Sequence, residues 1–246
     1  MLKLIIGITV LLTGLTTDYI RAETLIFVTT DWPPYTIGQD EDVSGIDVEI
    51  IQEFIKRNKI DAKILAIPWK RALDGVEEGF YHAIFTLKKT AEREKFLHYP
   101  TEQLENELTA IFSIKGKNIK AKSLEDLKNQ TVGVVRGYTY GKEFDSSEFI
   151  IKDEGVDDKM MVNKLVNGRY DLIAGEEISV KYLANKDKTM LETVYILGDY
   201  PTYIGFSIKG LGAKKDKLAL QFDVTMRQLV KEGFVEKIRA SYMKGQ

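Results

Sequence analysis

The sequence contains no cysteine. This absence excludes disulfides, thiol catalysis, cysteine metal sites and a lipid anchor attached to an N-terminal cysteine. Histidine is almost as scarce, because His82 and His98 are the only two and lie far apart without neighbours at metal-ligand spacing. We therefore expect neither a metal site nor a cofactor, and no nucleophile paired with a histidine.

A large excess of one charge is also absent. Lys and Arg together number 35 and Asp and Glu 37, so the formal net charge is −2. A nucleic-acid-binding protein needs a basic excess on one face, so we expect no nucleic-acid partner. The 246 residues, 44% of them hydrophobic, are enough for one large or two small globular domains.

Long apolar runs are missing beyond the N-terminus. A basic residue precedes an apolar run over residues 4–15, which is too short to span a bilayer comfortably. This pattern predicts a signal peptide over residues 1–22, cleaved after the small residue Ala22. An uncleaved anchor is the alternative, which the short run and its polar flank disfavour. We expect an exported protein without a lipid anchor, in the periplasm of a two-membrane bacterium.

Residues 83–93 carry the clearest indication of a binding site. The segment begins as an apolar strand, turns polar through Thr86 and Lys88, and reaches Arg93 in a short helix that Thr90 can cap. A loop from a strand end to a helix start presents N–H groups and a dipole that favour an anion. Arg93 can hold a carboxylate through two hydrogen bonds. The alternative is a solvated basic turn with Arg93 in a surface ion pair.

Strands and helices alternate through the first half of the chain. Short apolar runs predict strands over residues 24–30, 62–67 and 83–85, and helical spacing predicts helices over residues 45–55 and 69–78. Such alternation indicates an α/β lobe with a largely parallel sheet.

The loops after these strands carry aromatic and polar residues. Trp32 and Tyr35 flank two prolines that fix the backbone, while Trp69 and Thr86 follow the next two strands. Because the carboxyl ends of parallel strands share one edge of a sheet, we interpret these loops as one pocket. Two aromatic residues beside prolines would also suit a packed loop without a ligand.

The second half of the chain repeats the alternation. Strands are predicted over residues 108–114, 131–135, 170–174, 194–197 and 203–208, and helices over residues 157–166, 176–185, 214–230 and 234–242. The turn over residues 136–141 has glycines that let the backbone approach a ligand at a second helix start. Glu176 lies at a strand-to-helix junction, where a carboxylate suits either a ligand cation or simply the helix dipole.

Together these residues resemble the bacterial extracellular solute-binding proteins of family 3, the polar amino acid type that serves ABC importers. The order and spacing of several short motifs carry the resemblance over nearly the whole mature chain. These motifs are Trp32-Pro-Pro-Tyr35, Gly45-Ile-Asp-Val48, Pro68-Trp69, Thr90-Ala-Glu-Arg93, Val132-Gly-Val-Val-Arg-Gly137, Gly168-Arg-Tyr-Asp171 and Gly205-Phe-Ser207.

The resemblance implies an α/β, two-lobed periplasmic-binding-protein-like fold with two hinge crossovers and the ligand in the interlobe cleft. The chain would cross near residues 104–108 and return near residues 198–204. Lobe 1 would then comprise residues 23–106 plus 202–246, and lobe 2 residues 107–201. The resemblance also implies a monomer.

The resemblance further implies roles for individual side chains. Arg93 matches the arginine that holds the ligand α-carboxylate, and Tyr138 and Thr139 match the second-lobe turn that donates to the same carboxylate. Trp32 and Trp69 match the aromatic positions that sandwich the ligand side chain.

Two site residues depart from the family pattern. Glu176 matches the acidic residue that accepts from the ligand α-amine, but it is one methylene longer than the usual aspartate. Lys88 stands at a position where a small hydroxyl residue is common in the family. A cationic Lys88 would favour an extra negative charge on the ligand, or would pair with Glu176. Tyr35 is expected beside the pocket rather than as a matched contact.

The resemblance implies a binding protein without catalytic residues. It would capture a small carboxylate-bearing ligand, an amino acid or a related compound, by hinge closure, with an ABC transporter permease as its partner. A ligand-sensing module for a signalling receptor would have the same lobes. A periplasmic dehydratase on this fold is a further alternative, in which Glu176 would be an acid with a raised pKa.

Overall fold

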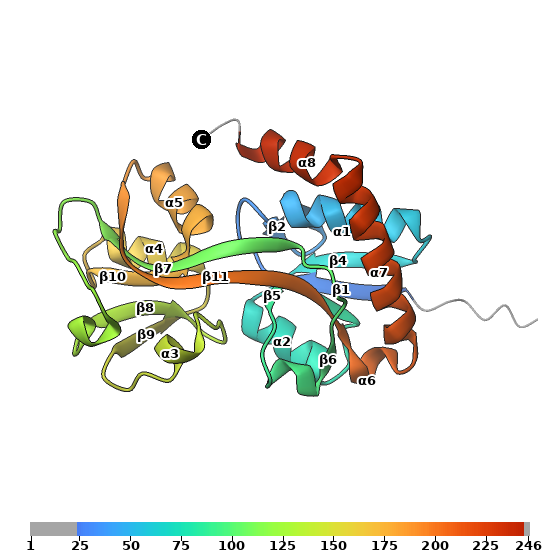
Figure 1. Cartoon of the computed structure of the whole chain (residues 1–246), viewed down its shortest axis with the longest axis horizontal. Coiled ribbons are helices and arrows are strands. Elements are labelled where there is room, and N and C mark those ends of the chain that lie inside the picture. Colours follow the sequence, from blue (N-terminus) through green and yellow to red (C-terminus); the bar gives the residue numbers. More distant parts are fainter. Residues whose placement is uncertain (1–23, 244–246) are drawn as a thin grey trace, which may run out of the picture.

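The computed structural model describes residues 24–243, so the predicted signal peptide and its cleavage site lie outside the described part (Figure 1). The strands are β1 (Leu25–Thr29), β2 (Ile37–Gln39), β3 (Asp42–Ser44), β4 (Ala62–Ala66), β5 (Ala83–Lys88), β6 (Leu97–His98), β7 (Glu105–Ile114), β8 (Thr131–Val135), β9 (Ile151–Gly155), β10 (Leu172–Glu176) and β11 (Leu191–Ser207). The α-helices are α1 (Ile46–Arg57), α2 (Trp69–Glu77), α3 (Lys142–Asp145), α4 (Asp158–Val166), α5 (Glu177–Lys186), α6 (Ile208–Leu211), α7 (Lys214–Lys231) and α8 (Phe234–Met243), and the 3-10 turns are η1 (Arg93–Lys95) and η2 (Leu124–Leu127).

The first lobe is built on three parallel strands in the order β4–β1–β5. Successive side chains of β1 enter different cores, since Phe27 packs with α1 and α7 whereas Val28 packs with α2. Helices therefore cover both faces of this sheet, which explains why its strands are apolar throughout. The loops at the strand ends are left to form a site.

The second lobe repeats this plan with parallel strands in the order β10–β8–β9. Helices α4 and α5 cover one face, where Met161 and Leu183 are buried, and α3 and η2 cover the other with Phe144 and Leu124. The α/β alternation predicted from the sequence is confirmed in both lobes.

Two long strands, β7 and β11, join the lobes (Figure 1). They are antiparallel and paired from Glu105 opposite Thr202 to Ile114 opposite Leu191. β11 also pairs with β5 of the first lobe, and β7 also pairs with β10 of the second. The two strands predicted over residues 194–197 and 203–208 are therefore wrong as separate elements. Bulges keep the intervening residues within one continuous strand.

Two helices that the sequence predicts, one after β5 and one after the turn over residues 136–141, are shorter than expected. β5 continues to Lys88, and only the 3-10 turn η1 follows it. The turn over residues 136–141 leads into α3, which is a single helical turn. Neither segment is long enough to give a substantial dipole, so an anion at this edge would depend on side chains and local N–H groups.

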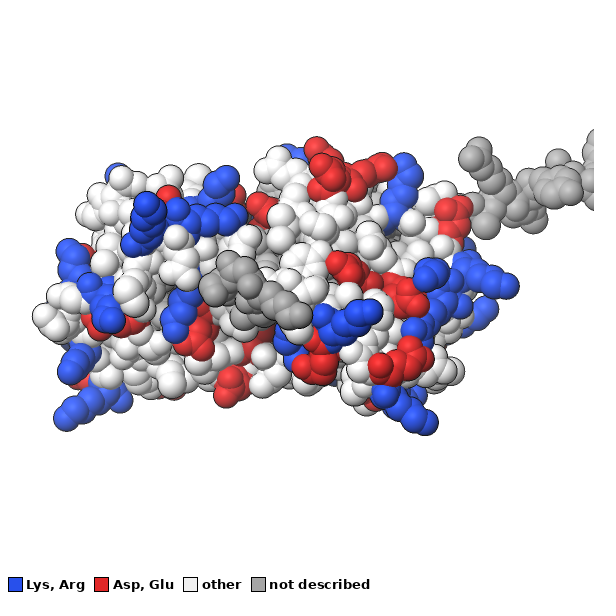
Figure 2. Space-filling view, turned by 90° about the horizontal axis from the view of Figure 1, so that it is seen from above, with Lys and Arg blue, Asp and Glu red and all other residues white. Residues whose placement is uncertain are grey.

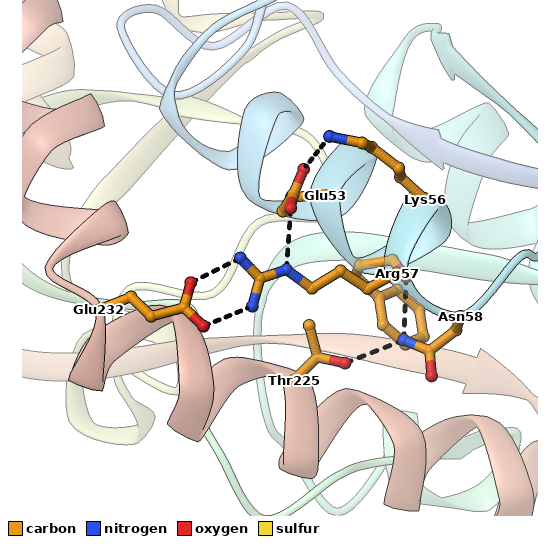
Figure 3. A network of polar contacts seen from close by, with 7 residues as sticks. Glu53, Lys56, Arg57, Asn58, Thr225 and Glu232 are labelled. Atoms are coloured by element: carbon orange, nitrogen blue, oxygen red, sulfur yellow. Dashed lines mark hydrogen bonds and ion pairs between the residues drawn. The ribbon is translucent and has the colours of Figure 1, made fainter.

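The C-terminal helices α7 and α8 pack on the first lobe. Phe222 of α7 meets Phe54 of α1 edge to face, with ring centroids 5.3 Å apart. Beside this contact Arg57 donates to both carboxylate oxygens of Glu232, at 2.9 and 2.6 Å, and Asn58 donates to the hydroxyl of Thr225 at 2.9 Å (Figure 3).

The surface reflects the near balance of charges. The face seen from above carries both basic and acidic side chains (Figure 2). Within residues 24–243 we find no helix long and apolar enough to cross a membrane.

The buried side of α7 should contribute much more stability than its exposed side. Phe222 is 1% exposed and Leu220 on the same helix is 63% exposed. Phe222→Ala should lower the free energy of unfolding by about 3–5 kcal/mol, because it removes a large buried ring. Leu220→Ala, the matched control, should change it by less than about 0.5 kcal/mol. Urea unfolding measures both, and equal effects would contradict this packing.

Candidate ligand-binding site

One cavity of about 50 Å³ lies between the lobes. Residues from both lobes line it, and they include every residue that the sequence singled out except Tyr35. The residues so placed are Trp32, Trp69, Thr86, Lys88, Arg93, Tyr138, Thr139 and Glu176. The three loops after β1, β4 and β5 thus converge as parallel strand ends should.

Thr86 forms a bulge in β5 that shapes the cavity. Its φ of 63° is in the left-handed region, which a β-branched residue rarely adopts. The pairing with β11 shifts at this point, so Ile84 and Leu87 enter the same core although they are three residues apart. The hydroxyl of Thr86 donates to the buried carboxylate of Asp47 at 2.6 Å. Strain of this kind is typical of functional sites.

Arg93 connects the two lobes across the cleft. Its Nη1 donates to the carbonyl of Lys88 at 2.8 Å, and its Nη2 donates to the carbonyl of Gly137 in the second lobe at 3.1 Å. The indole Nε1 of Trp69 donates to the same Gly137 carbonyl at 3.0 Å. Gly137 has a φ of 79°, which favours glycine. Burial lowers the pKa of Arg93, but its guanidinium has five N–H donors and these two bonds use only part of them.

Aromatic rings form the walls of the cavity. Trp69 and Tyr138 meet edge to face across the cleft, with centroids 5.5 Å apart. The guanidinium of Arg93 lies 5.5 Å from the Trp69 ring centre. Trp32 lines the cavity from the loop after β1. These rings offer flat apolar surfaces to a ligand beside a cation.

Glu176 is the last residue of β10 and caps helix α5. Its two carboxylate oxygens accept from the backbone N–H groups of Ile178 and Ser179, at 3.0 and 2.8 Å. Burial raises the pKa of Glu176 to about 7, and these two N–H bonds oppose the rise. A carboxylate can accept about four hydrogen bonds, so Glu176 retains capacity for a ligand amine.

Lys88 faces the cavity from the end of β5. Its ammonium donates to the hydroxyl of Thr109 at 2.5 Å and lies 4.2 Å from the centre of the Tyr200 ring. Burial lowers the pKa of Lys88 to about 8, and the negative charge of Glu107 opposes that change. Lys88 thus donates its hydrogen bond to a residue of the hinge strand β7.

Two residues from the sequence analysis have other contacts. Tyr35 packs behind Trp32, with ring centroids 4.9 Å apart, and lines a separate groove beside Arg239. The hydroxyl of Thr139 donates to the carboxylate of Asp145.

The hinge strands β7 and β11 supply a wall of the cavity that was not predicted from the sequence. Glu107 and Thr109 of β7 and Thr202 of β11 all line the cavity and are almost fully buried. A signal for β7 was available, because Glu105, Glu107 and Thr109 alternate with other residues and so share one strand face. Polar residues on the buried face of a strand need partners.

The described residues hold no group of three or more His, Asp or Glu side chains placed to bind a metal ion. The side chains that line the cavity combine a guanidinium, an ammonium, two carboxyl groups and four aromatic rings around a small interlobe space.

The fold and the cavity are those of a ligand-binding protein with two α/β lobes. The sequence matches the bacterial extracellular solute-binding proteins, family 3, over residues 25–245, and the chain belongs to that family. Its members are binding proteins. No curated protein sequence matches the chain.

Solved structures show the same fold at low sequence identity. The P235GK mutant of ArgBP from T. maritima has a TM-score of 0.77 and 20% identity, covering 89% of this chain and 94% of that one. The amino acid ABC transporter substrate-binding protein AbpA from Streptococcus pneumoniae Canada MDR_19A, bound to L-arginine, has a TM-score of 0.76 and 17% identity, covering 89% and 94%. A histidine kinase sensor domain with similarity to periplasmic binding proteins has a TM-score of 0.76 and 18% identity, covering 90% and 96%.

The buried carboxyl groups predict how stability depends on pH. Burial raises the pKa of both Glu176 and Asp158 to about 7. The folded protein therefore holds protons that the unfolded chain releases from about pH 4 to 5 upwards. Stability contributed by these protonated groups is present below that range and is lost as the pH rises through about 7.

The melting temperature of the ligand-free protein should accordingly fall from about pH 5 to about pH 8. The fall should correspond to a loss of a few kcal/mol in the free energy of unfolding. Calorimetry across this range measures the slope. Glu176→Gln should flatten it, whereas Glu154→Gln, a change at a carboxylate that is 51% exposed, should leave it unchanged. A melting temperature that rises with pH would contradict the placement of these carboxyl groups.

Proposed function

We propose that the protein captures a small carboxylate-bearing ligand, an amino acid or a related compound, in the periplasm and delivers it to the permease of an ABC importer. One observation carries the proposal. Arg93 of the first lobe and Glu176 of the second line the same small cavity with opposite charges. A zwitterion has a carboxylate for the first and an amine for the second.

The carboxylate end of the ligand would lie on Arg93. The guanidinium donates to the carbonyls of Lys88 and Gly137, and its remaining N–H donors suit a carboxylate. The Trp69 ring beside the guanidinium keeps water away from it. The amine would lie on Glu176, whose ionised form the ligand would favour. Each buried charge of the ligand then has an opposite partner, which burial requires.

Closure about the hinge would complete the site. We place the hinge at residues 104–108 and 198–204, which divides the chain into lobe 1 (23–106 plus 202–246) and lobe 2 (107–201). Trp69 and Arg93 both bond the Gly137 carbonyl across this division. A ligand that contacts both lobes stabilises the closed form more than the open form and shifts the equilibrium toward closure.

The relatives support an importer as the partner, because their names include amino acid ABC transporter binding proteins. A second candidate is a ligand-sensing role, favoured by the similarity to a histidine kinase sensor domain. Both roles use the same capture step. Neighbouring genes separate them, since an importer requires a permease and an ATPase, and a sensor requires a kinase.

A thermal-shift screen of the mature protein against amino acids, dicarboxylates and small aromatic acids tests the capture step. A ligand that binds only the folded state raises the melting temperature. We expect a hit with a zwitterionic amino acid. Hits confined to ligands without an amine would contradict the role of Glu176 and assign Lys88 to the ligand.

Arg93→Ala should weaken binding of the confirmed ligand by about a hundredfold or more, because it leaves a buried carboxylate without its partner. Titration calorimetry measures the loss. Arg136→Ala is the matched control, since Arg136 is 56% exposed and pairs with Glu154 outside the cavity. Unchanged binding by Arg93→Ala would show that this cavity is not the site.

A further inference from the structure

The wall formed by the hinge strands has polar groups that the capture of a zwitterion leaves unused. Glu107 lies on β7 opposite Tyr200 of β11, and Thr202 of β11 lies opposite Lys88 of β5. Glu107, Thr202 and Lys88 all line the cavity. They therefore face the ligand from three adjacent strands of one sheet.

Two of these groups lack a partner although they are buried. Glu107 and Thr202 are each 1% exposed, and neither the Oε1 of Glu107 nor the Oγ1 of Thr202 has a hydrogen-bond partner within residues 24–243. Buried polar atoms in folded proteins are nearly always paired, and leaving one unpaired destabilises the protein. Their position on the cavity wall makes a ligand group the natural partner.

Lys88 supplies a donor beside these two groups. One of its three N–H groups is bound to Thr109 at 2.5 Å, and the ammonium is held over the Tyr200 ring. Burial, with the neighbouring carboxylates of Glu176 and Asp47, raises the pKa of Glu107 well above its usual range, and the charge of Lys88 opposes that rise. The Oε1 of Glu107 is thus an unpaired acceptor on the wall beside the ammonium donor of Lys88.

The charges of the cavity restrict the ligand side chain. Arg93 and Glu176 balance the carboxylate and the amine of the ligand. An acidic side chain would offer no donor to the unpaired Oε1 of Glu107, a basic one would be repelled by Lys88, and an apolar one would leave buried polar atoms unpaired. The volume of about 50 Å³ is also only a few times the space that one water molecule needs, so a short side chain fits best.

We propose that Lys88, Glu107 and Thr202 form a side-chain subsite that selects amino acids with a short neutral side chain carrying both a donor and an acceptor, namely a hydroxyl or a carboxamide. This inference rests on the proposed capture of a zwitterion and names its ligand class. Lys88 donates to the side-chain oxygen, and Glu107 accepts from the hydroxyl or amide hydrogen. Thr202 can do either.

Matched ligand pairs test the subsite by titration calorimetry on the wild-type protein. Serine should bind at least about tenfold more tightly than alanine, and asparagine at least about tenfold more tightly than aspartate, because each pair differs in the group that the subsite recognises. The serine and asparagine results also separate a hydroxyl preference from a carboxamide preference. Glutamine and glutamate extend the comparison to a longer side chain.

Two variants test whether Glu107 is responsible. Glu107→Gln adds an amide donor that an aspartate side chain can accept from, so the preference for asparagine over aspartate should fall by about tenfold or more. Glu105→Gln is the matched control. Glu105 is on the same face of β7 but lines the separate groove and pairs with Arg239, so the preference should stay unchanged. The wild-type ratios decide the question if Glu107→Gln does not fold.

The outcomes distinguish the subsite from the capture mechanism. If an acidic, basic or apolar amino acid binds most tightly, or if the two variants change the preference equally, the subsite is wrong and zwitterion capture remains. If none of the twenty amino acids binds, zwitterion capture fails and the subsite fails with it.

Discussion

The pairing of β7 with β11 is the constraint on which the rest of the structure depends. Each strand belongs to both lobes, because β11 pairs with β5 on one side and β7 pairs with β10 on the other. The pair is therefore the hydrogen-bonded link between two independent cores. It is also a wall of the cavity, through Glu107, Thr109 and Thr202. A change in the twist of these strands would move the lobes and reshape the ligand site together.

Charged groups gather where these strands cross the cleft, and the arrangement is unfavourable without a ligand. Glu107 and Glu176 face the same small space as Lys88 and Arg93, and burial raises the pKa of both carboxyl groups. Taking such charges out of water destabilises the protein unless each has a partner. A ligand with complementary groups removes that penalty, so the same feature that limits the stability of the free closed form supplies affinity and selectivity.

The sequence predicts the parts of this structure that local patterns determine. Apolar runs and helical spacing locate the parallel strands, and parallel strand ends bring Trp32, Trp69 and Thr86 to one edge. Strand pairing between distant parts of the chain determines the features that the sequence did not predict. Residues 194–197 and 203–208 were predicted as two strands, but pairing with β7 keeps the residues between them in one strand. The bulge at Thr86 could not be foreseen, because threonine does not favour a positive φ and the bulge depends on the register with β11. Glu107 was missed because its strand was expected to begin at residue 108, three residues after its actual start at Glu105.

The most direct test of the account is the distance between the lobes with and without ligand. The absence of cysteine allows two spin labels to be placed without other changes, at Glu77→Cys on α2 and Glu143→Cys on α3, both exposed positions on different lobes. Pulsed electron paramagnetic resonance then gives the distribution of distances. The account predicts that a saturating amino acid ligand shortens and narrows this distribution, because Arg93 and Glu176 hold one ligand from both lobes. An unchanged distribution at full occupancy would contradict it.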